Sequence, residues 1–249
     1  MAFESSAQLY DSIYEGKNYE REVLLISEIF SSRNSPISKI LDVGCGTGTH
    51  SILLAKQNQW RITAIDSSAE MIDCARNKAQ NDNLSIEFLV LPINQISELS
   101  GKFDVVMALF HVVNYIPSSK ALTHFFNSSK ELLNPNGILL FDMWNGKLCS
   151  RERFKEKRIT FKSHGKNWQR ISTPELDDEH NKVQIKHSYL STENPEKEFI
   201  ETHDLAFWTA NDVVAMAGES FSRVEILESE NGESFNELTH WSPLFIMQE

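Results

Sequence analysis

Cysteine is scarce in this chain of 249 residues, and that scarcity excludes several classes of protein. The three cysteines, Cys45, Cys74 and Cys149, are odd in number and none shares a CxxC spacing. A framework of disulfides and a thiolate metal site are therefore excluded, and reduced thiols are expected. No His, Asp and Glu residues recur at the spacing of metal ligands, so no metal is predicted.

Long apolar runs and an excess of positive charge are also missing. The longest apolar runs, such as Val105–Phe110 and Ile138–Phe141, are far shorter than the roughly 20 residues that cross a bilayer. The first residues lack the basic and apolar regions of a signal peptide, so we expect no membrane partner and a cytoplasmic location. The chain has 24 Lys and Arg against 35 Asp and Glu, a net charge of −11. Because this charge repels phosphodiester backbones, no nucleic-acid partner is expected.

Strand and helix patterns alternate five times in the first 143 residues. Short β-rich runs are separated by segments with apolar residues at three-to-four-residue spacing, which is typical of helices. The predicted strands are Lys39–Val43, Arg61–Asp66, Ser85–Leu91, Phe103–Leu109 and Gly137–Met143. The predicted helices are Tyr19–Phe30, His50–Gln57, a segment running to Gln80 and Ser119–Leu133. Ser67 and Glu70 have the spacing of a capping box for the third helix, and Asn134–Gly137 carries the turn residues that stop the fourth.

After Trp144 the sequence pattern changes to runs in which polar and apolar residues alternate. These runs predict antiparallel strands over Arg158–Lys162, Trp168–Ser172, Lys182–Leu190 and Phe199–Phe207, laid over the core as a cap. A last helix, Thr209–Ser220, and two strands, Arg223–Glu228 and Trp241–Met247, are expected to rejoin the main sheet.

Together these patterns predict an α/β fold. Its core is a Rossmann-like, doubly wound, mostly parallel sheet, with an antiparallel β cap inserted after the fifth strand. The predicted domains are an N-terminal helical lid (1–35), a cofactor-binding core (36–145), the cap (146–207), and a C-terminal helix and strands that complete the core sheet (208–249).

The most specific motif is a glycine loop between the first strand and the next helix. Gly44, Gly46 and Gly48 follow Asp42, and glycine there lets a ligand lie against bare main chain. A dinucleotide fingerprint requires glycine where this chain has Thr49, which argues against a nicotinamide oxidoreductase. An acidic side chain beside the loop repels a pyrophosphate and suits a ligand with a positive amino-acid head or a sulfonium.

Asp66 ends the second strand, where a carboxylate can accept both hydroxyls of a ribose. Its alternative role is to cap the following helix, a role that Ser67 and Glu70 are expected to fill. Met71 is placed either under an adenine or in the core.

The segments ILDVGCGTGTHSILLA, ITAIDSSAEMIDCAR, FDVVMALFHVVNY and ELLNPNGILLFDMW resemble class I S-adenosylmethionine-dependent methyltransferases over residues 36–145. The resemblance implies that Asp42 and the glycine loop hold the methionine part of the cofactor, and that Asp66 holds its ribose. Leu91-Pro92-Ile93 stands where many relatives have Gly-Asp, so adenine recognition would rest on backbone groups. The residues predicted to bind S-adenosylmethionine are Tyr19, Asp42, Gly44, Cys45, Gly46, Gly48, Thr49, Asp66, Ser67, Met71, Pro92, Ile93 and Leu109.

A narrower resemblance lies outside the core. Residues 7–19, 158–187, 201–203 and 241–246 are similar to methyltransferases of unusual-sugar biosynthesis, including the amino-sugar N,N-dimethyltransferases. This resemblance implies a small-molecule acceptor.

Methyl transfer is a direct displacement, so an enzyme chiefly aligns the reactants and excludes water. Tyr14 and Tyr19 are expected to form part of an aromatic lid, with packing of an N-terminal helix as the alternative. His111 follows the fourth strand at the edge of the sheet where ligands bind, and is either a general base or a residue that shapes the pocket. The predicted catalytic residues are His111, Tyr14 and His203, and a surface strand position is the alternative for His203.

Residues 146–170 hold nine Lys and Arg against two Glu. This basic stretch fits a phosphate or diphosphate on the acceptor, and its alternative is a solvated strand face. The residues predicted to bind the acceptor are Tyr14, His111, Trp144, Asn145, Arg158, Arg170, His187 and Trp241. The predicted function is methyl transfer to an amine or hydroxyl of a small molecule, with a non-catalytic cofactor-binding protein as the alternative, and a homodimer is left open.

Overall fold

The computed structural model describes residues 5–33, 35–152, 154–177, 179–191, 193 and 198–249. Its larger layer is a seven-stranded sheet in the order β10-β11-β5-β4-β1-β2-β3. Five of its strands are parallel: β1 (Lys39–Val43), β2 (Arg61–Asp66), β3 (Glu87–Val90), β4 (Phe103–Ala108) and β5 (Leu133–Asp142). The remaining two, β10 (Arg223–Glu228) and β11 (Pro243–Gln248), are antiparallel and extend the sheet beyond β5.

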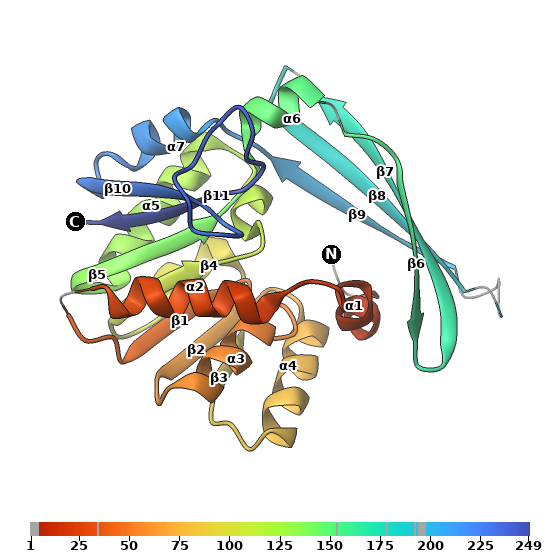
Figure 1. The fold of residues 1–249 in the computed structure, drawn as a ribbon, viewed down its shortest axis with the longest axis horizontal. Coiled ribbons are helices and arrows are strands. Elements are labelled where there is room, and N and C mark those ends of the chain that lie inside the picture. Colours follow the sequence, from red (N-terminus) through yellow and green to blue (C-terminus); the bar gives the residue numbers. More distant parts are fainter. Residues whose placement is uncertain (1–4, 34, 153, 178, 192, 194–197) are drawn as a thin grey trace.

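Helices cover both faces of this sheet (Figure 1). On one face lie α2 (Tyr19–Ser31), α3 (Thr49–Gln57) and α4 (Ala69–Asn81), and on the other α5 (Ser119–Leu132) and α7 (Ala210–Ala217). Consecutive strand residues pack on opposite faces of the sheet: Ile40 packs with the first set of helices and Leu41 with the second. Both side chains are fully buried, which explains why the strands appear in the sequence as continuous apolar runs.

A second, four-stranded antiparallel sheet forms the cap in the order β6-β7-β8-β9. Its strands are β6 (Lys157–Ser163), β7 (Lys166–Asp177), β8 (Lys182–Ser191) and β9 (Phe199–Ala206). The short helix α6 (Gly146–Glu152) links the cap to β5, and α1 (Ala7–Ile13) lies between the cap and the core (Figure 1). Two 3₁₀ turns, η1 (Ile93–Glu98) and η2 (Val112–Tyr115), follow β3 and β4. The predicted fold class is confirmed.

Two local predictions are wrong. The cap of α4 is Ser68 rather than Ser67, because the Ser68 hydroxyl accepts the Met71 N–H at 3.1 Å. The run Asn134–Gly137 is not a separate turn: α5 ends at Leu132 and β5 begins at once. Asn136 adopts a left-handed φ of 64° within β5, and the β4–β5 register shifts there, so the turn-forming residues bulge the strand instead of interrupting it.

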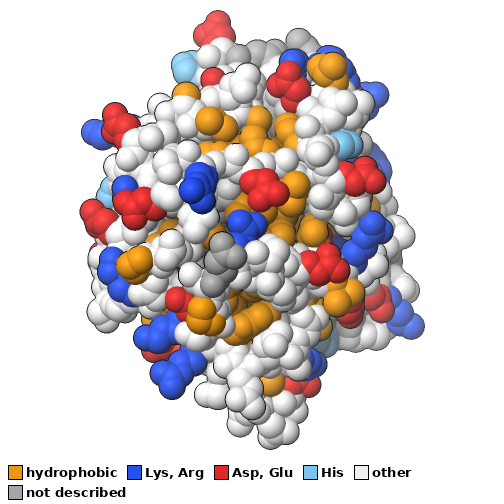
Figure 2. Space-filling view, turned by 60° about the vertical axis from the view of Figure 1, so that its left-hand side comes forward, with side chains coloured by type: hydrophobic (Ala, Val, Ile, Leu, Met, Phe, Trp, Pro, Cys, Tyr) orange, Lys and Arg blue, Asp and Glu red, His pale blue; other side chains and the backbone are white. Residues whose placement is uncertain are grey.

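The surface mixes both signs of charge. Figure 2 shows basic and acidic side chains interspersed over one face, with hydrophobic side chains in the hollows between them. Within the described ranges, no helix is both long enough and apolar enough to cross a membrane.

Candidate active site

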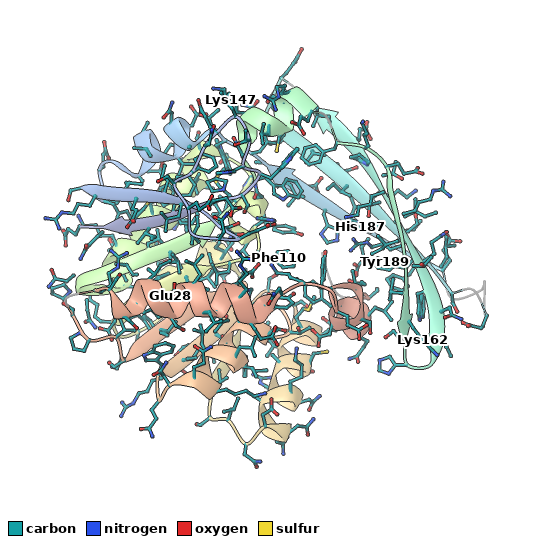
Figure 3. The ribbon with its side chains drawn as sticks, in the orientation of Figure 1. Glu28, Phe110, Lys147, Lys162, His187 and Tyr189 are labelled. Carbon is teal, nitrogen blue, oxygen red and sulfur yellow. The ribbon has the colours of Figure 1, made fainter. Side chains whose placement is uncertain are left out.

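A cavity of about 390 Å³ lies between the core sheet and the cap. The core lines it with the glycine loop and with residues that follow β2, β3 and β4, at the carboxyl edge where wound sheets bind ligands. The cap lines it with residues of β7, β8 and β9. Figure 3 shows Phe110 at the edge of the core and His187 on the cap, on opposite sides of this space.

The three glycines of the loop have left-handed φ angles, but the space around them differs. A Cβ on Gly44 would lie 2.5 Å from Val112 Cγ1, so side-chain packing alone requires glycine there. At Gly46, which lines the cavity, a Cβ would meet no heavy atom within 4 Å. Gly46 therefore leaves open the part of the cavity that the loop surrounds.

Asp66 lines the cavity and connects the glycine loop to the start of α4. Its Oδ2 accepts the Gly46 N–H and its Oδ1 accepts the Ser68 N–H, both at 2.9 Å. Burial raises the pKa of the carboxyl, and these backbone donors oppose that rise. Asp66 thus stabilises the turn between β2 and α4 and also lines the cavity.

Asp42 lies behind the loop and is not part of the cavity lining. Only 2% of its surface is exposed, and its Oδ2 accepts the Ser51 hydroxyl at 2.6 Å. Burial raises its pKa to about 6, against the hydrogen bond from Ser51.

Aromatic side chains from the N-terminal segment close one side of the cavity. Ring centroids are 4.8 Å apart for Tyr10 and Tyr14, 5.0 Å for Tyr14 and Phe110, and 5.1 Å for Tyr19 and His50. Phe110 also receives the Lys17 ammonium 4.4 Å from its ring centroid. The sequence reasoning missed Phe110, although its position after β4 at the sheet edge was a usable signal.

Helix α1 is held against the glycine loop by Asp11. Its carboxylate accepts the Thr47 hydroxyl at 2.6 Å and the Lys78 ammonium at 2.8 Å. Lys78 also donates to Thr49 at 3.0 Å, so α1, the loop and α4 share one polar cluster.

Phe110 and His111 are consecutive residues with left-handed φ angles of 63° and 65°. Such conformations cost about 1–3 kcal/mol each for residues other than glycine, and they persist where the surroundings hold them. Here Asp142, the last residue of β5, accepts the His111 backbone N–H at 3.0 Å. His111 lines the cavity beside Trp144, with ring centroids 5.9 Å apart.

The cap side of the cavity carries a buried polar cluster. Tyr115 Oη lies 2.8 Å from His203 Nδ1, and the rings of His203 and His187 are 4.6 Å apart. Burial, His203 and Arg170 lower the pKa of His187 to about 3, so this imidazole is neutral near pH 7. His203 is 2% exposed, which excludes the surface position considered for it.

Arg170 is the buried cation of this wall, with 8% of its surface exposed. Its guanidinium donates to Tyr14 Oη at 3.3 Å and lies 5.6 Å from the Tyr14 ring centroid. Among the described residues, Arg170 forms no ion pair with a carboxylate and its Nε has no hydrogen-bond partner.

Most of the predicted site residues line this cavity. They are Tyr14, Tyr19, Gly44, Cys45, Gly46, Thr49, Asp66, Ser67, Met71, Ile93, Leu109, His111, Trp144, Arg170, His187 and His203.

Six predicted residues, including Asp42, are outside the lining. Gly48 packs against Ala75 and Phe88, and Pro92 precedes η1. Asn145 is structural, since its amide donates to the Glu237 and His240 carbonyls.

Asn145 is one of three among these six that were expected to contact the acceptor, and the other two face outwards instead. Trp241 is 42% exposed, and the Arg158 guanidinium donates to Glu156 at 2.9 Å. Alternation along β6 explains the direction of Arg158, because its neighbour Lys157 lines the cavity, as Lys155 does. Arg153, part of the basic stretch, lies outside the described residues.

Comparisons with known proteins agree with this geometry. Residues 40–137 match the family described as "Methyltransferase domain". A Bacillus subtilis (strain 168) protein named as a methyltransferase, YqeM, is 32% identical over 143 residues, which are 57% of this chain and 56% of the relative. The dTDP-3-amino-3,4,6-trideoxy-alpha-D-glucopyranose N,N-dimethyltransferase of Streptomyces venezuelae is 30% identical over 141 residues, 55% of this chain and 56% of the relative. The chain therefore spans little more than half the length of these curated relatives.

The likeness of fold extends further than the likeness of sequence. A crystal structure of an S-adenosylmethionine-dependent methyltransferase from Clostridium acetobutylicum ATCC 824 superposes with a TM-score of 0.79 at 20% identity, covering 100% of this chain and 99% of that one. The resemblance of the glycine loop and Asp66 to methyltransferases is confirmed: residues 40–137 match a methyltransferase domain, and the chain shares the fold of a solved S-adenosylmethionine-dependent methyltransferase.

Proposed function

We propose that this protein transfers a methyl group from S-adenosylmethionine to an amine or hydroxyl of a small molecule. One observation carries the proposal: a single cavity joins the glycine loop and Asp66 to the polar wall of the cap. One end suits the cofactor and the other suits an acceptor, so the two reactants would meet inside one cavity.

The residues present fit the cofactor. The open space at Gly46 suits a ligand lying on the main chain, and Asp66 faces that space with an acceptor carboxylate. When bound there, S-adenosylmethionine supplies an electrophilic methyl group on its sulfonium. The chain itself would orient the acceptor and exclude water, which the ring contacts among Tyr10, Tyr14 and Phe110 support.

We further propose that the acceptor is a nucleotide-linked amino sugar. The buried guanidinium of Arg170 is without a carboxylate partner among the described residues, and Lys155 and Lys157 line the same cavity. Arg and Lys meet phosphate oxygens with charge-assisted hydrogen bonds of about 1.5–3 kcal/mol each. A relative named as acting on a dTDP-linked amino sugar supports this class of acceptor.

Turnover tests the proposal directly. The protein is incubated with S-adenosylmethionine and either a dTDP-linked 3-amino sugar or the corresponding free sugar, and both S-adenosylhomocysteine and the mass shift of the acceptor are measured. We expect methylation of the nucleotide-linked sugar at an efficiency at least tenfold above that of the free sugar. Equal efficiency on the two would contradict the acceptor class. Cofactor binding without methylation of these sugars or of a lysate metabolite pool would contradict the enzymatic function.

Two arginines of the basic stretch provide a matched pair of variants. Arg170→Ala should raise the KM for the acceptor about tenfold or more and leave the KM for the cofactor nearly unchanged. Arg158→Ala removes the same charge from the outward face and should change neither constant. If both variants change the KM for the acceptor to the same extent, Arg170 does not contact the acceptor.

A further inference from the structure

We propose that Asp142 is a positioning residue that fixes the imidazole of His111 with its proton on Nδ1, so that Nε2 faces the cavity as a proton acceptor. This inference rests on the proposed function, because the proton that Nε2 takes belongs to the acceptor's amine or hydroxyl. His111 would then act as the general base, and Asp142 would act through His111 without touching the acceptor.

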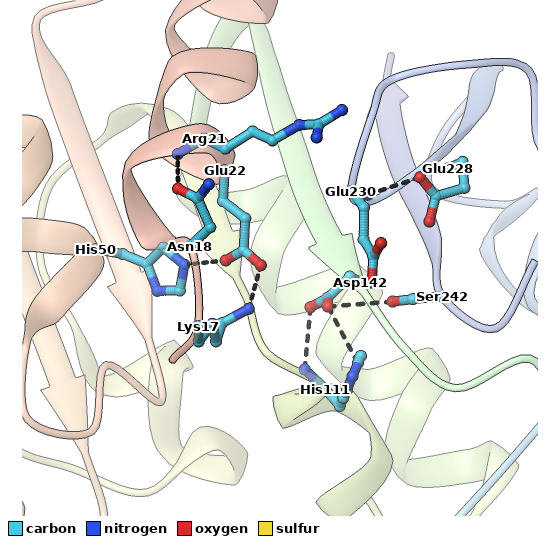
Figure 4. Close-up of polar contacts among 10 residues, drawn as sticks. All are labelled: Lys17, Asn18, Arg21, Glu22, His50, His111, Asp142, Glu228, Glu230 and Ser242. Atoms are coloured by element: carbon cyan, nitrogen blue, oxygen red, sulfur yellow. Dashed lines mark hydrogen bonds and ion pairs between the residues drawn. The ribbon is translucent and has the colours of Figure 1, made fainter. Parts of the chain in front are cut away.

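The carboxylate of Asp142 meets His111 twice (Figure 4). Oδ1 accepts the His111 backbone N–H at 3.0 Å. Oδ2 lies 3.0 Å from Nδ1, which is an ion-pair distance, but the angle between them does not make a hydrogen bond. The backbone bond helps to hold the left-handed conformation that turns the ring towards the cavity. With Nδ1 at the carboxylate, Nε2 is the ring nitrogen left for a ligand.

Asp142 is ionised in this setting. It is 7% exposed, and although burial opposes ionisation, the charge and hydrogen bonds of His111 lower the pKa of its carboxyl. Lys17, on the segment between α1 and α2, lowers this pKa further. Ser242, which precedes β11, approaches Oδ2 at 3.4 Å and brings no charge. An ionised carboxylate beside Nδ1 favours the tautomer with the proton there.

The proton moves from the acceptor to His111 and then to solvent water. The acceptor's N–H or O–H bond breaks and its proton goes to His111 Nε2, while the electron pair stays on the nucleophilic atom. The imidazolium that forms is stabilised by the negative charge of Asp142. Water then takes the proton from Nε2 and returns the ring to its starting tautomer.

Asp142→Asn tests the positioning role with a side chain of the same shape. An amide has one acceptor oxygen, and if that oxygen keeps the backbone N–H bond, the NH₂ group faces Nδ1 and forces the proton onto Nε2. In protein labelled with ¹⁵N-histidine, NMR of the cofactor-free enzyme should show His111 with the Nδ1–H tautomer predominant, and in Asp142→Asn the Nε2–H tautomer predominant. Asp104→Asn is the matched control: it alters a carboxylate that accepts from Ser38, Lys39 and Asn134, and should leave the His111 tautomer unchanged.

Activity separates this inference from the proposed function. On an acceptor that the wild type methylates, Asp142→Asn should lower kcat at least tenfold with little change in either KM, and Asp142→Glu should recover part of it. A wild-type His111 with its proton on Nε2, or an unchanged tautomer in Asp142→Asn, would overturn the inference even if the protein methylates sugars. Failure to bind S-adenosylmethionine would instead overturn the proposed function and leave the NMR result to decide the positioning role.

Discussion

Asp42 is buried behind the glycine loop, with a pKa of about 6 set by that burial. This value is above the ordinary value of 3.8, so the folded state binds a proton more tightly than the unfolded chain. The stability that this proton contributes is fully present below about pH 4 and is lost as pH rises through about 6. Near pH 7 the charged carboxylate therefore lowers the free energy of unfolding by on the order of 2–3 kcal/mol.

Asp42→Asn should remove this pH dependence. The amide oxygen can still accept the Ser51 hydroxyl, and it carries no charge at any pH. In urea titrations we expect the variant to be more stable than the wild type at pH 7.5, with the difference shrinking as pH falls from 6.5 to 4.5. A constant difference across that range would mean that Asp42 is not the group responsible.

Among single residues, the sequence predicts those whose role follows from a motif. It does not predict those whose role depends on the three-dimensional fold. Asp66 and Gly46 belong to a recognisable pattern, and both line the cavity. Phe110 and Asp142 lie in segments that resemble the family, but their roles were not predicted, because one depends on a backbone conformation and the other on a contact between β5 and the residue 31 positions earlier. Arg158 lies outside the cavity lining, and the sequence could not show this because charge alone does not tell which face of a strand a side chain occupies.

Among the elements, the glycine loop needs glycine for two different reasons that its sequence does not distinguish. Gly44 avoids a clash, and Gly46 leaves space open in the cavity. Gly44→Ala would place a Cβ 2.5 Å from Val112, whereas a Cβ at Gly46 meets nothing within 4 Å. We expect Gly44→Ala to lower the free energy of unfolding by about 1–3 kcal/mol more than Gly46→Ala, since overpacking adds to the shared strain of a left-handed φ.

Gly46→Val should instead act on the cofactor. Its side chain would fill open space in the cavity, so affinity for S-adenosylmethionine should fall at least tenfold while the protein stays folded. Calorimetry and denaturant titration of the three variants separate the two effects. Equal losses of stability for Gly44→Ala and Gly46→Ala would contradict the packing argument.

The bounds of compact strands were predicted more accurately than the start of β5. The bounds expected for β1, β2 and β10 agree with the structure because each is a compact β-rich run. The start of β5 was missed because Asn134–Gly137 carries turn residues, yet pairing with β4 and β11 holds the strand together. Tertiary hydrogen bonds here override local propensity.

At the scale of the whole molecule, two sheets cooperate in one site. The core carries the glycine loop and Asp66 at the edge that the wound topology creates, and the cap covers that edge with His187, His203 and Arg170. The sequence predicted both sheets from their periodicity. It also predicted that the cap lies over the core. It did not predict the contacts that join α1 to both layers, because Asp11 and Ser12 bind residues distant in the chain: Thr47 and Lys78 in the core, and Ser163 in the cap.

We propose that this cavity holds S-adenosylmethionine through the glycine loop and Asp66. Isothermal titration calorimetry of the wild type, Asp66→Ala and Asp73→Ala with S-adenosylmethionine tests it most directly. Asp73 loses the same charge from an exposed site on α4 and serves as the control. We predict that the wild type binds, that Asp73→Ala binds equally well, and that Asp66→Ala binds at least tenfold more weakly, because hydrogen bonds to a charged group are worth about 1.5–3 kcal/mol each. Wild-type affinity in a folded Asp66→Ala variant, or no binding by the wild type, would mean that the glycine loop and Asp66 do not hold the cofactor.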